Sequence, residues 1–157
     1  MADAPRYMTP AGHRAMVEEF AELGRERTRV VKGVADAAAE GDRSENAEYI
    51  YGKKRLRQID KKIRFISKTL DAAVVVDPAL DRGDKVFFGA TVLLEDEEGG
   101  TRTVQLVGEH ETSAEEGKIS YRSPVGAALM RRLLDDEVTV RTPGGTRVYV
   151  IAEILYR

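Results

Sequence analysis

The chain has 157 residues, of which 42% are hydrophobic and 33% charged, and its formal net charge is −2. This length fits one ordinary domain or two small ones, and the composition is that of a globular protein rather than a disordered chain. The absence of cysteine and the presence of only two histidines exclude disulfides and thiolate chemistry and argue against a histidine-based zinc site. Because neither a leader-like segment nor a membrane-length apolar run occurs, we expect a cytoplasmic protein without a membrane partner.

A long helix is predicted from about residue 10 to the high 30s. Thr9 followed by Pro10 is a good start signal, because a hydroxyl caps the helix and proline suits its first turn. The apolar residues recur at alternating spacings of three and four, which is typical of a helix packed on one partner helix. They are Met16, Phe20, Leu23, Val30, Val34 and Ala37, with Arg27 as one polar interruption.

A second helix follows after a short connection. Its apolar series is Leu56, Ile59, Ile63, Ile66 and Leu70, and Gly52 near its start should cost about 1 kcal/mol of helix stability relative to alanine. The connection from Glu40 to Asn46 contains glycine and cap-type residues and is short enough to force the helices antiparallel. We therefore predict a coiled-coil hairpin over residues 1–77, with arms of about 28 residues that make a rod roughly 40 Å long, and with a tip at residues 40–48.

After Asp77-Pro78 the pattern changes to short β-branched and aromatic runs separated by glycine and acidic turns, which indicates strands. We predict strands at 85–94, 101–107, 118–121, 137–141 and 146–155, with the last two joined through Thr142–Gly145. One helix is predicted at 125–134, introduced by Ser123 as N-cap and Pro124 at its first position. Residues 78–157 are thus expected to form a small antiparallel sheet with one helix, which places the chain in the α+β class.

The second predicted helix carries a basic stripe between Lys53 and Lys68, in which one acid, Asp60, stands among eight cations. They are Lys53, Lys54, Arg55, Arg57, Lys61, Lys62, Arg64 and Lys68. Their mutual repulsion is expected to be uncompensated, since the alternating acid and base pairs of a neutral exposed helix are missing. A focused basic segment on a near-neutral chain indicates local contact with one polyanion, although a solvated helix face is the ordinary explanation of such a run.

The tip concentrates Asp42, Ser44, Glu45, Asn46 and Glu48 far from any core. Two carboxylates three residues apart can face the same way, and Mg²⁺ accepts one or two carboxylates together with waters and phosphates. Asp42 and Glu45 would therefore suit half of a shared Mg²⁺ site. From spacing alone, however, helix capping is the commoner explanation, because Asp42 or Ser44 can be an N-cap and Asp42 with Glu45 resembles a capping box.

The stretch Gly41-Asp42-Arg43-Ser44-Glu45-Asn46-Ala47-Glu48-Tyr49, followed by Tyr51, Lys53–Arg57 and Ile59-Asp60, closely resembles the hairpin tip and second helix of the Gre transcript cleavage factors, and the basic continuation favours the GreB branch. Further matches are Lys85–Ala90, Ile119-Ser120, Ser123-Pro124 and Ala127–Leu129, so the resemblance covers nearly the whole chain. Arg122 departs from the pattern at a place where such factors can carry an acid.

The resemblance implies that residues 78–157 are an FKBP-like domain that grips the rim of the secondary channel of a bacterial RNA polymerase, with Ser123 and Pro124 at the contact. The hairpin would enter that channel, where Asp42 and Glu45 help to bind a second Mg²⁺ jointly with the polymerase, supported by Ser44 and Asn46. The polymerase itself then cleaves the 3′ end of backtracked RNA and resumes elongation. The chain would not be an enzyme by itself and would have no small-molecule substrate.

Within this framework, the cations nearest the tip, Lys53, Lys54, Arg57 and Lys61, are predicted to contact the extruded RNA. Two other functions stay open. A Gre-like inhibitor would occupy the same channel without stimulating RNA cleavage, and a coiled-coil adaptor would use the tip acids only as caps and would not bind polymerase.

Overall fold

The structure, a computed structural model, describes residues 6–41 and 46–157 and divides into two compact units. The first unit is His13–Ala72. The second contains Ala73–Arg157 together with the chain up to Gly12. The units therefore divide the chain after residues 12 and 72, whereas the sequence suggested a single division at 77.

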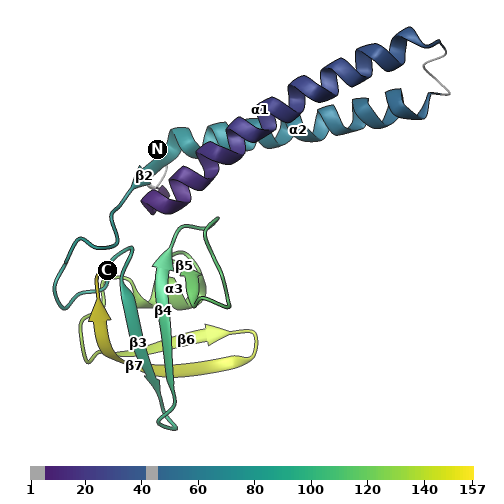
Figure 1. The fold of residues 1–157 in the computed structure, drawn as a ribbon. Helices are drawn as coiled ribbons and strands as arrows, with labels where there is room; N and C mark the ends of the chain where they lie inside the picture. Colours follow the sequence, from purple (N-terminus) through teal and green to yellow (C-terminus); the bar gives the residue numbers. More distant parts are fainter. Residues whose placement is uncertain (1–5, 42–45) are drawn as a thin grey trace, which may run out of the picture. The chain divides into compact units, whose positions relative to one another are not determined.

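The first unit is the predicted helical hairpin. Helix α1 (Pro10–Ala39) and helix α2 (Ala47–Ala72) run side by side in opposite directions (Figure 1). The buried positions of its seam belong to the two predicted apolar series and are Met16, Leu23, Ala37, Ile59 and Ile66. Phe20, which was also assigned to the seam, is 40% exposed. In the part of the chain that the structure describes, no helix is both long and apolar enough to cross a membrane.

Ion pairs follow both margins of this seam. Arg27, the polar interruption of the first series, donates from Nε to Asp60 Oδ1 at 2.7 Å, so the interruption has its partner on α2. Arg55 forms a fork with Glu26, with Nε–Oε1 at 2.7 Å and Nη2–Oε2 at 2.9 Å, and its hydrogen bonds hold the pKa of that carboxyl below the ordinary value. The expectation of uncompensated repulsion is therefore wrong for Arg55, and also for Lys62, which pairs with Glu19 at 2.7 Å. The sequence signal was missed because the compensating acids lie on the other helix.

Gly52 lies where α2 approaches α1 closely. A Cβ added at this position would lie 2.6 Å from Val34 Cγ2, which is closer than real side chains tolerate. The glycine therefore provides room for Val34, and its low helix propensity is the cost of that contact.

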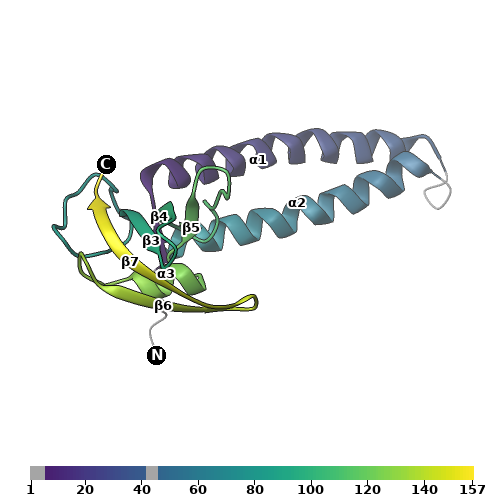
Figure 2. The same cartoon turned by 90° about the horizontal axis from the view of Figure 1, so that it is seen from below.

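The second unit contains a five-stranded sheet, which appears strongly curled in Figure 2. The strand order is β5 (Lys118–Ser120), β4 (Thr101–Val107), β3 (Thr91–Asp96), β7 (Gly145–Leu155) and β6 (Glu137–Thr142), with helix α3 (Pro124–Leu129) inserted between β5 and β6 along the chain. Alternate residues of the strands point inward to one core. Its fully buried members include Val92, Leu94, Leu106, Leu129 and Ile151.

The predicted mixed architecture is confirmed, with three corrections. The pairing of β4 with β5 is parallel, whereas the other pairs of this sheet are antiparallel. The strand predicted at 85–94 begins only at Thr91, because the chain turns at Gly89, whose φ of +90° suits glycine. The helix predicted to reach Leu134 ends at Leu129, and Arg131 has a φ of +70° that no helix continues.

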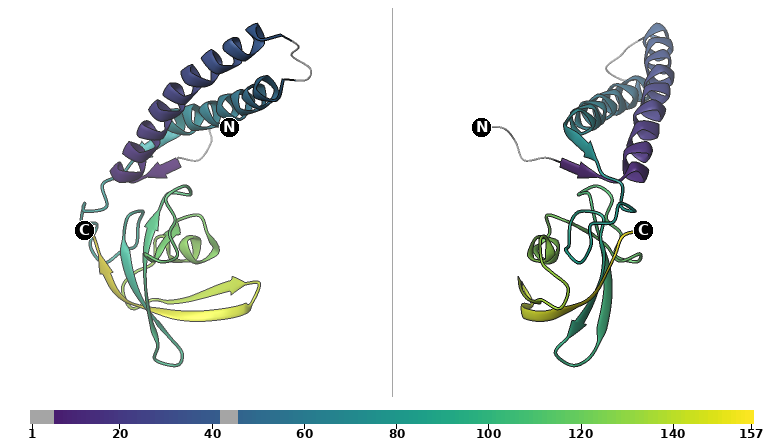
Figure 3. Two further views of the ribbon diagram at one scale, coloured as in Figure 1. Left: turned by 45° about the vertical axis from the view of Figure 1, so that its right-hand side comes forward. Right: turned by 90° about the vertical axis from the view of Figure 1, so that its left-hand side faces the viewer.

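Two short strands that the sequence did not predict hold the beginning of the chain on this unit. Strand β1 (Arg6–Met8) pairs in parallel with β2 (Ala73–Val75), and the two lie together in Figure 3. The ring centroid of Tyr7 lies 5.5 Å from that of Phe88 and 5.4 Å from that of Tyr121. The backbone N–H of Tyr7 also donates to the Tyr121 hydroxyl, with an N–O distance of 3.2 Å. Three-residue strands carry too little periodicity to be recognised in a sequence.

Thr9 caps α1 as predicted, since its Oγ1 accepts from Gly12 N at 3.1 Å. Glu111, in the acid-rich segment from Glu109 to Glu116, reinforces this cap. Its carboxylate accepts from Thr9 N at 3.0 Å, from Gly108 N at 2.9 Å and from the Thr9 hydroxyl. These contacts lie within the second unit, to which the chain up to Gly12 belongs.

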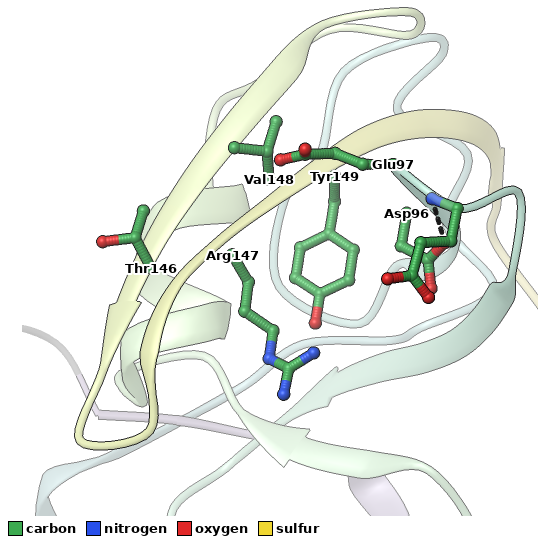
Figure 4. A pocket seen from close by; sticks show the side chains of 7 residues that line it. Asp96, Glu97, Thr146, Arg147, Val148 and Tyr149 are labelled. Atoms are coloured by element: carbon green, nitrogen blue, oxygen red, sulfur yellow. Dashed lines mark hydrogen bonds between the residues drawn. The ribbon is translucent and has the colours of Figure 1, made fainter.

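Two further acid-rich segments, Glu95–Glu98 and Asp135–Glu137, also contain carboxylates that shape turns. Asp96 Oδ1 accepts from Glu98 N at 2.9 Å and from Gly100 N at 2.8 Å, which closes the turn between β3 and β4. Figure 4 shows Asp96 at a pocket of about 220 Å³ that Arg147 and Tyr149 of β7 also line. Asp136 accepts from Leu133 N at 2.8 Å. These acids serve the backbone of the sheet unit, as local side-chain hydrogen bonds commonly do in turns.

The contact between Gly52 and Val34 gives a test of the hairpin packing. In an open helix position, Gly→Ala should raise the free energy of unfolding by up to about 1 kcal/mol. Gly33 in α1 meets no other atom within 4 Å at its added Cβ and should show this gain. Gly52→Ala should show no gain or a net loss, because overpacking offsets the propensity. Urea unfolding of both variants measures the difference, and equal gains would contradict the proposed close packing.

Candidate functional site

The tip of the hairpin joins the end of α1 to the start of α2. Helix α1 ends at Ala39, and Gly41 has a φ of +133°, which favours glycine at this point. Helix α2 begins at Ala47. Asp42, Ser44 and Glu45 lie outside the described residues, so their assignment as Mg²⁺ ligands and tip support stays a prediction.

Asn46 fastens the two helices to each other at the tip. Its Oδ1 accepts from Tyr49 N at 3.1 Å, which is the bond that an N-cap residue makes to the third residue of its helix. Its Nδ2 donates to the carbonyl oxygen of Ala37 at 2.8 Å, near the end of α1, where helix carbonyls lack partners within the helix. The side chain thus satisfies one backbone group from each helix.

This finding bears on the alternative explanation of the tip acids. The sequence left open that Asp42 or Ser44 caps the second helix, but Asn46 fills the N-cap role of α2. The signal was available, because asparagine is among the best N-cap residues and stands directly before Ala47. Capping of α2 therefore requires no carboxylate from the tip.

The four cations predicted to contact RNA differ in their surroundings. Lys54, Arg57 and Lys61 are exposed, and at spacings of three and four they share the face of α2 roughly opposite the buried Ile59 and Ile66. Lys53 lines a groove between the helices with apolar residues of α1, so its stem covers the seam margin. The structure therefore groups three of the four cations into one outward row.

None of these four cations has an ion pair with an acid among residues 6–41 and 46–157, in contrast to Arg55 and Lys62. Their charge is thus available to an external partner. A row of positive charges along a helix can follow the phosphates of a single nucleic-acid strand. A compact anion would contact only part of such a row.

Among residues 6–41 and 46–157, no group of three or more histidine, aspartate or glutamate side chains could hold a metal ion. The carboxylates of Asp42 and Glu45 are oxygen donors of the type Mg²⁺ prefers, but two of them fill only part of its octahedral shell. The donor set therefore fits a site completed by another molecule.

Ser123 and Pro124, the predicted rim contact, lie at the edge of an open groove of about 760 Å³ in the sheet unit. The Ser123 hydroxyl donates to Ser120 O at 2.6 Å and accepts from Gly126 N at 3.1 Å, so it is occupied as the N-cap of α3. Pro124 is exposed. The nearby Arg122 pairs with Glu109 at 2.9 Å. The groove combines an apolar floor at Ile119 and Val125 with charged margins, as protein interfaces do.

Comparison with known proteins assigns both parts of the chain to one kind of factor. Residues 6–75 match the family model for the N-terminal part of transcription elongation factors, and residues 81–156 match the model for the C-terminal part of GreA/GreB. Transcription elongation factor GreB of Yersinia pestis is 50% identical over 96% of this chain and 89% of its own. Transcription elongation factor GreA of Zymomonas mobilis is 44% identical over 91% and 90%.

Two solved structures are also similar. The GreA factor homolog Gfh1 of Thermus thermophilus is 23% identical over 96% of this chain and 99% of its own, with a TM-score of 0.45. A GreA/GreB factor of Nitrosomonas europaea is 26% identical over 66% of this chain and 90% of its own, with a TM-score of 0.43.

The two hydrogen bonds of Asn46 can be separated by mutation. Asn46→Asp keeps the N-cap acceptor and removes the donor to Ala37, whereas Asn46→Ala removes both. We expect the alanine variant to lose about 0.5–2 kcal/mol of stability, with the aspartate variant between it and the wild type. Helix content and thermal unfolding by circular dichroism measure the effect. An unchanged alanine variant would show that Asn46 does not hold the tip.

Proposed function

Because the chain belongs to the GreA/GreB family of transcription elongation factors, we propose that its tip brings Asp42 and Glu45 to RNA polymerase as ligands of a second Mg²⁺. Factors of this family enter the polymerase secondary channel and stimulate the cleavage of RNA that the polymerase itself performs. The chain is thus an elongation factor that assists a catalyst and is not the catalyst. The predicted family is confirmed, and several relatives at 45–50% identity are named GreB.

The observation that carries the proposal is the hydrogen bonding of Asn46. Asn46 caps α2 and also bonds the end of α1, so an amide side chain joins the two helices at the tip. Asp42 and Glu45 are then not needed as the cap of α2, which supports their proposed role as Mg²⁺ ligands. A bound Mg²⁺ supplies charge stabilisation and a more acidic water to phosphodiester hydrolysis.

The hairpin is suited to carry these acids to a recessed site. Helix α1 has 30 residues and α2 has 26, which corresponds to lengths of roughly 45 and 40 Å at 1.5 Å per residue. With one buried seam and paired charges along it, the rod needs no support from a surrounding core. The tip can therefore lie far from the other end of the hairpin.

The outward row of Lys54, Arg57 and Lys61, with Lys53 beside it, is proposed to contact the phosphates of the extruded RNA 3′ segment. This proposal is supported by the position of the row, because these cations lie along one face of α2, the helix that starts at the tip. At the other end of the chain, the groove beside Ser123 and Pro124 is proposed to hold the polymerase rim. In that contact Ser123 would act by fixing α3, and the exposed Pro124 would touch the partner.

The tip carboxylates are tested by Asp42→Asn and Glu45→Gln. Each change removes a negative charge and keeps a similar shape, so loss of a metal ligand should lower the rate of RNA cleavage by backtracked polymerase at least about 100-fold, the size of effect seen when an electrostatic stabiliser is removed. Raising the Mg²⁺ concentration should partly restore the rate, since a weakened site binds the ion less tightly.

The control for these variants is binding. Competition with the wild type for the polymerase and thermal unfolding should both be unchanged. Cleavage that persists at the wild-type rate would assign the two acids a role other than metal ligation. Inhibition of elongation by a wild-type chain that never stimulates cleavage would instead identify a channel inhibitor.

The outward cations are tested by the double variant Lys54→Gln/Lys61→Gln against Lys62→Gln, whose lysine is paired with Glu19. If the first two lysines meet RNA phosphates, the salt dependence of action on long backtracked transcripts should become shallower by about 0.7 in log–log slope for each lysine. The Lys62→Gln control should keep the wild-type slope. Equal salt-dependence slopes in the wild type and both variants would show that Lys54 and Lys61 do not contact RNA.

A further inference from the structure

Tyr51 has the largest exposed fraction, 72%, among the large hydrophobic side chains that are exposed in the described part of the chain. Single exposed apolar residues are common on protein surfaces and need no explanation alone. Tyr51 differs because of its position. It lies five residues after Asn46, about 7 Å along the axis from the start of α2, and therefore close to the tip.

The two tyrosines at this end of α2 have opposite surroundings. Tyr49 is half-buried and lines the groove between the helices with Val34 and Leu56. Tyr51, two residues later, points to a different side of the helix and stays exposed. Packing of the hairpin therefore accounts for Tyr49, whereas the side chain of Tyr51 is left mostly exposed.

The neighbours of Tyr51 on its own helix are cations. Lys54 and Arg55 follow at three and four residues, which places them beside its ring on the helix surface. Arg55 is held by its fork with Glu26, whereas Lys54 is exposed and has no acidic partner among the described residues. An open aromatic face thus lies next to an available positive charge, and Lys61 continues the charge one heptad further.

This combination fits single-stranded nucleic acid. Such strands are bound where a cationic track follows the phosphates and aromatic side chains stack on the bases. We propose that Tyr51 stacks on one nucleobase of the extruded RNA while Lys54 meets an adjacent phosphate. The inference rests on the proposed function and adds to it a base contact that tolerates any sequence, since every base presents a π face.

The stacking contact predicts a coupling between the tyrosine ring and one base. Backtracked complexes are assembled with transcripts that carry a single abasic residue at successive positions of the extruded segment. Cleavage rates are measured at subsaturating factor for the wild type, Tyr51→Ala, Tyr51→Phe and Ile50→Ala. Ile50 is 51% exposed and adjacent, so its variant controls for the loss of exposed apolar surface.

At one abasic position the wild-type rate should fall by about five- to hundredfold, the range found when stacked aromatics are removed. Tyr51→Ala should show the same loss on intact RNA and no further loss at that abasic position. Tyr51→Phe and Ile50→Ala should both behave as the wild type, because a phenyl ring still stacks and an aliphatic chain does not.

Two outcomes would overturn the inference alone. Tyr51→Ala could act at the wild-type rate, or it could be slowed equally on every transcript, which would assign the ring to a protein surface of the polymerase. A wild-type protein that stimulates no cleavage on intact RNA would instead overturn the proposed function together with the inference.

Discussion

The narrow seam between the two long helices is the constraint on which the other features of the hairpin depend. Each helix of the hairpin packs on one other helix, so the described residues that become buried in this unit are few. They are Met16, Leu23, Ala37, Ile59 and Ile66. A seam this thin cannot keep a unique register by apolar contact alone, and ion pairs of opposite sense, Arg27 with Asp60 and Glu26 with Arg55, align its margins. The remaining helix surface is then free for other molecules.

The same seam divides the basic stripe into two groups with different roles. Cations that flank the seam, such as Arg55 and Lys62, are matched by acids of α1 and contribute to the hairpin. Cations that face away from the seam, such as Lys54 and Lys61, are exposed and lack such partners among the described residues. A helix could not hold this excess of positive charge without the acids of its neighbour, because like charges three and four residues apart repel. The ion pairs of the first group therefore reduce the charge repulsion on α2 that the second group adds.

Periodicity predicted the hairpin and most strands, because its signal is spread over many residues. Features set by contacts across the chain were not predictable in this way. The partners of Arg55 and Lys62 lie on the other helix, and β1 is recognisable only from its pairing with β2 and from the packing of Tyr7. At the tip, residue types indicated the chemistry, but several side chains there were suitable caps. Asparagine was one of them, and the hydrogen bonds of Asn46 identify it as the cap of α2.

The choice of an amide at position 46 has a chemical reason. Closing the tip requires an acceptor for the Tyr49 N–H and a donor for the Ala37 carbonyl, and an ionised carboxylate can only accept. A carboxylate in the capping position would also interact with the positive N-terminal end of the helix dipole. The N–H groups there would compete with a cation for the lone pairs of the carboxylate. Because asparagine makes both bonds, neither Asp42 nor Glu45 is needed for them, which supports the proposed role of these acids as ligands. Two such ligands bind Mg²⁺ weakly by themselves, so the ion would be held firmly only where a partner supplies the rest of its coordination shell.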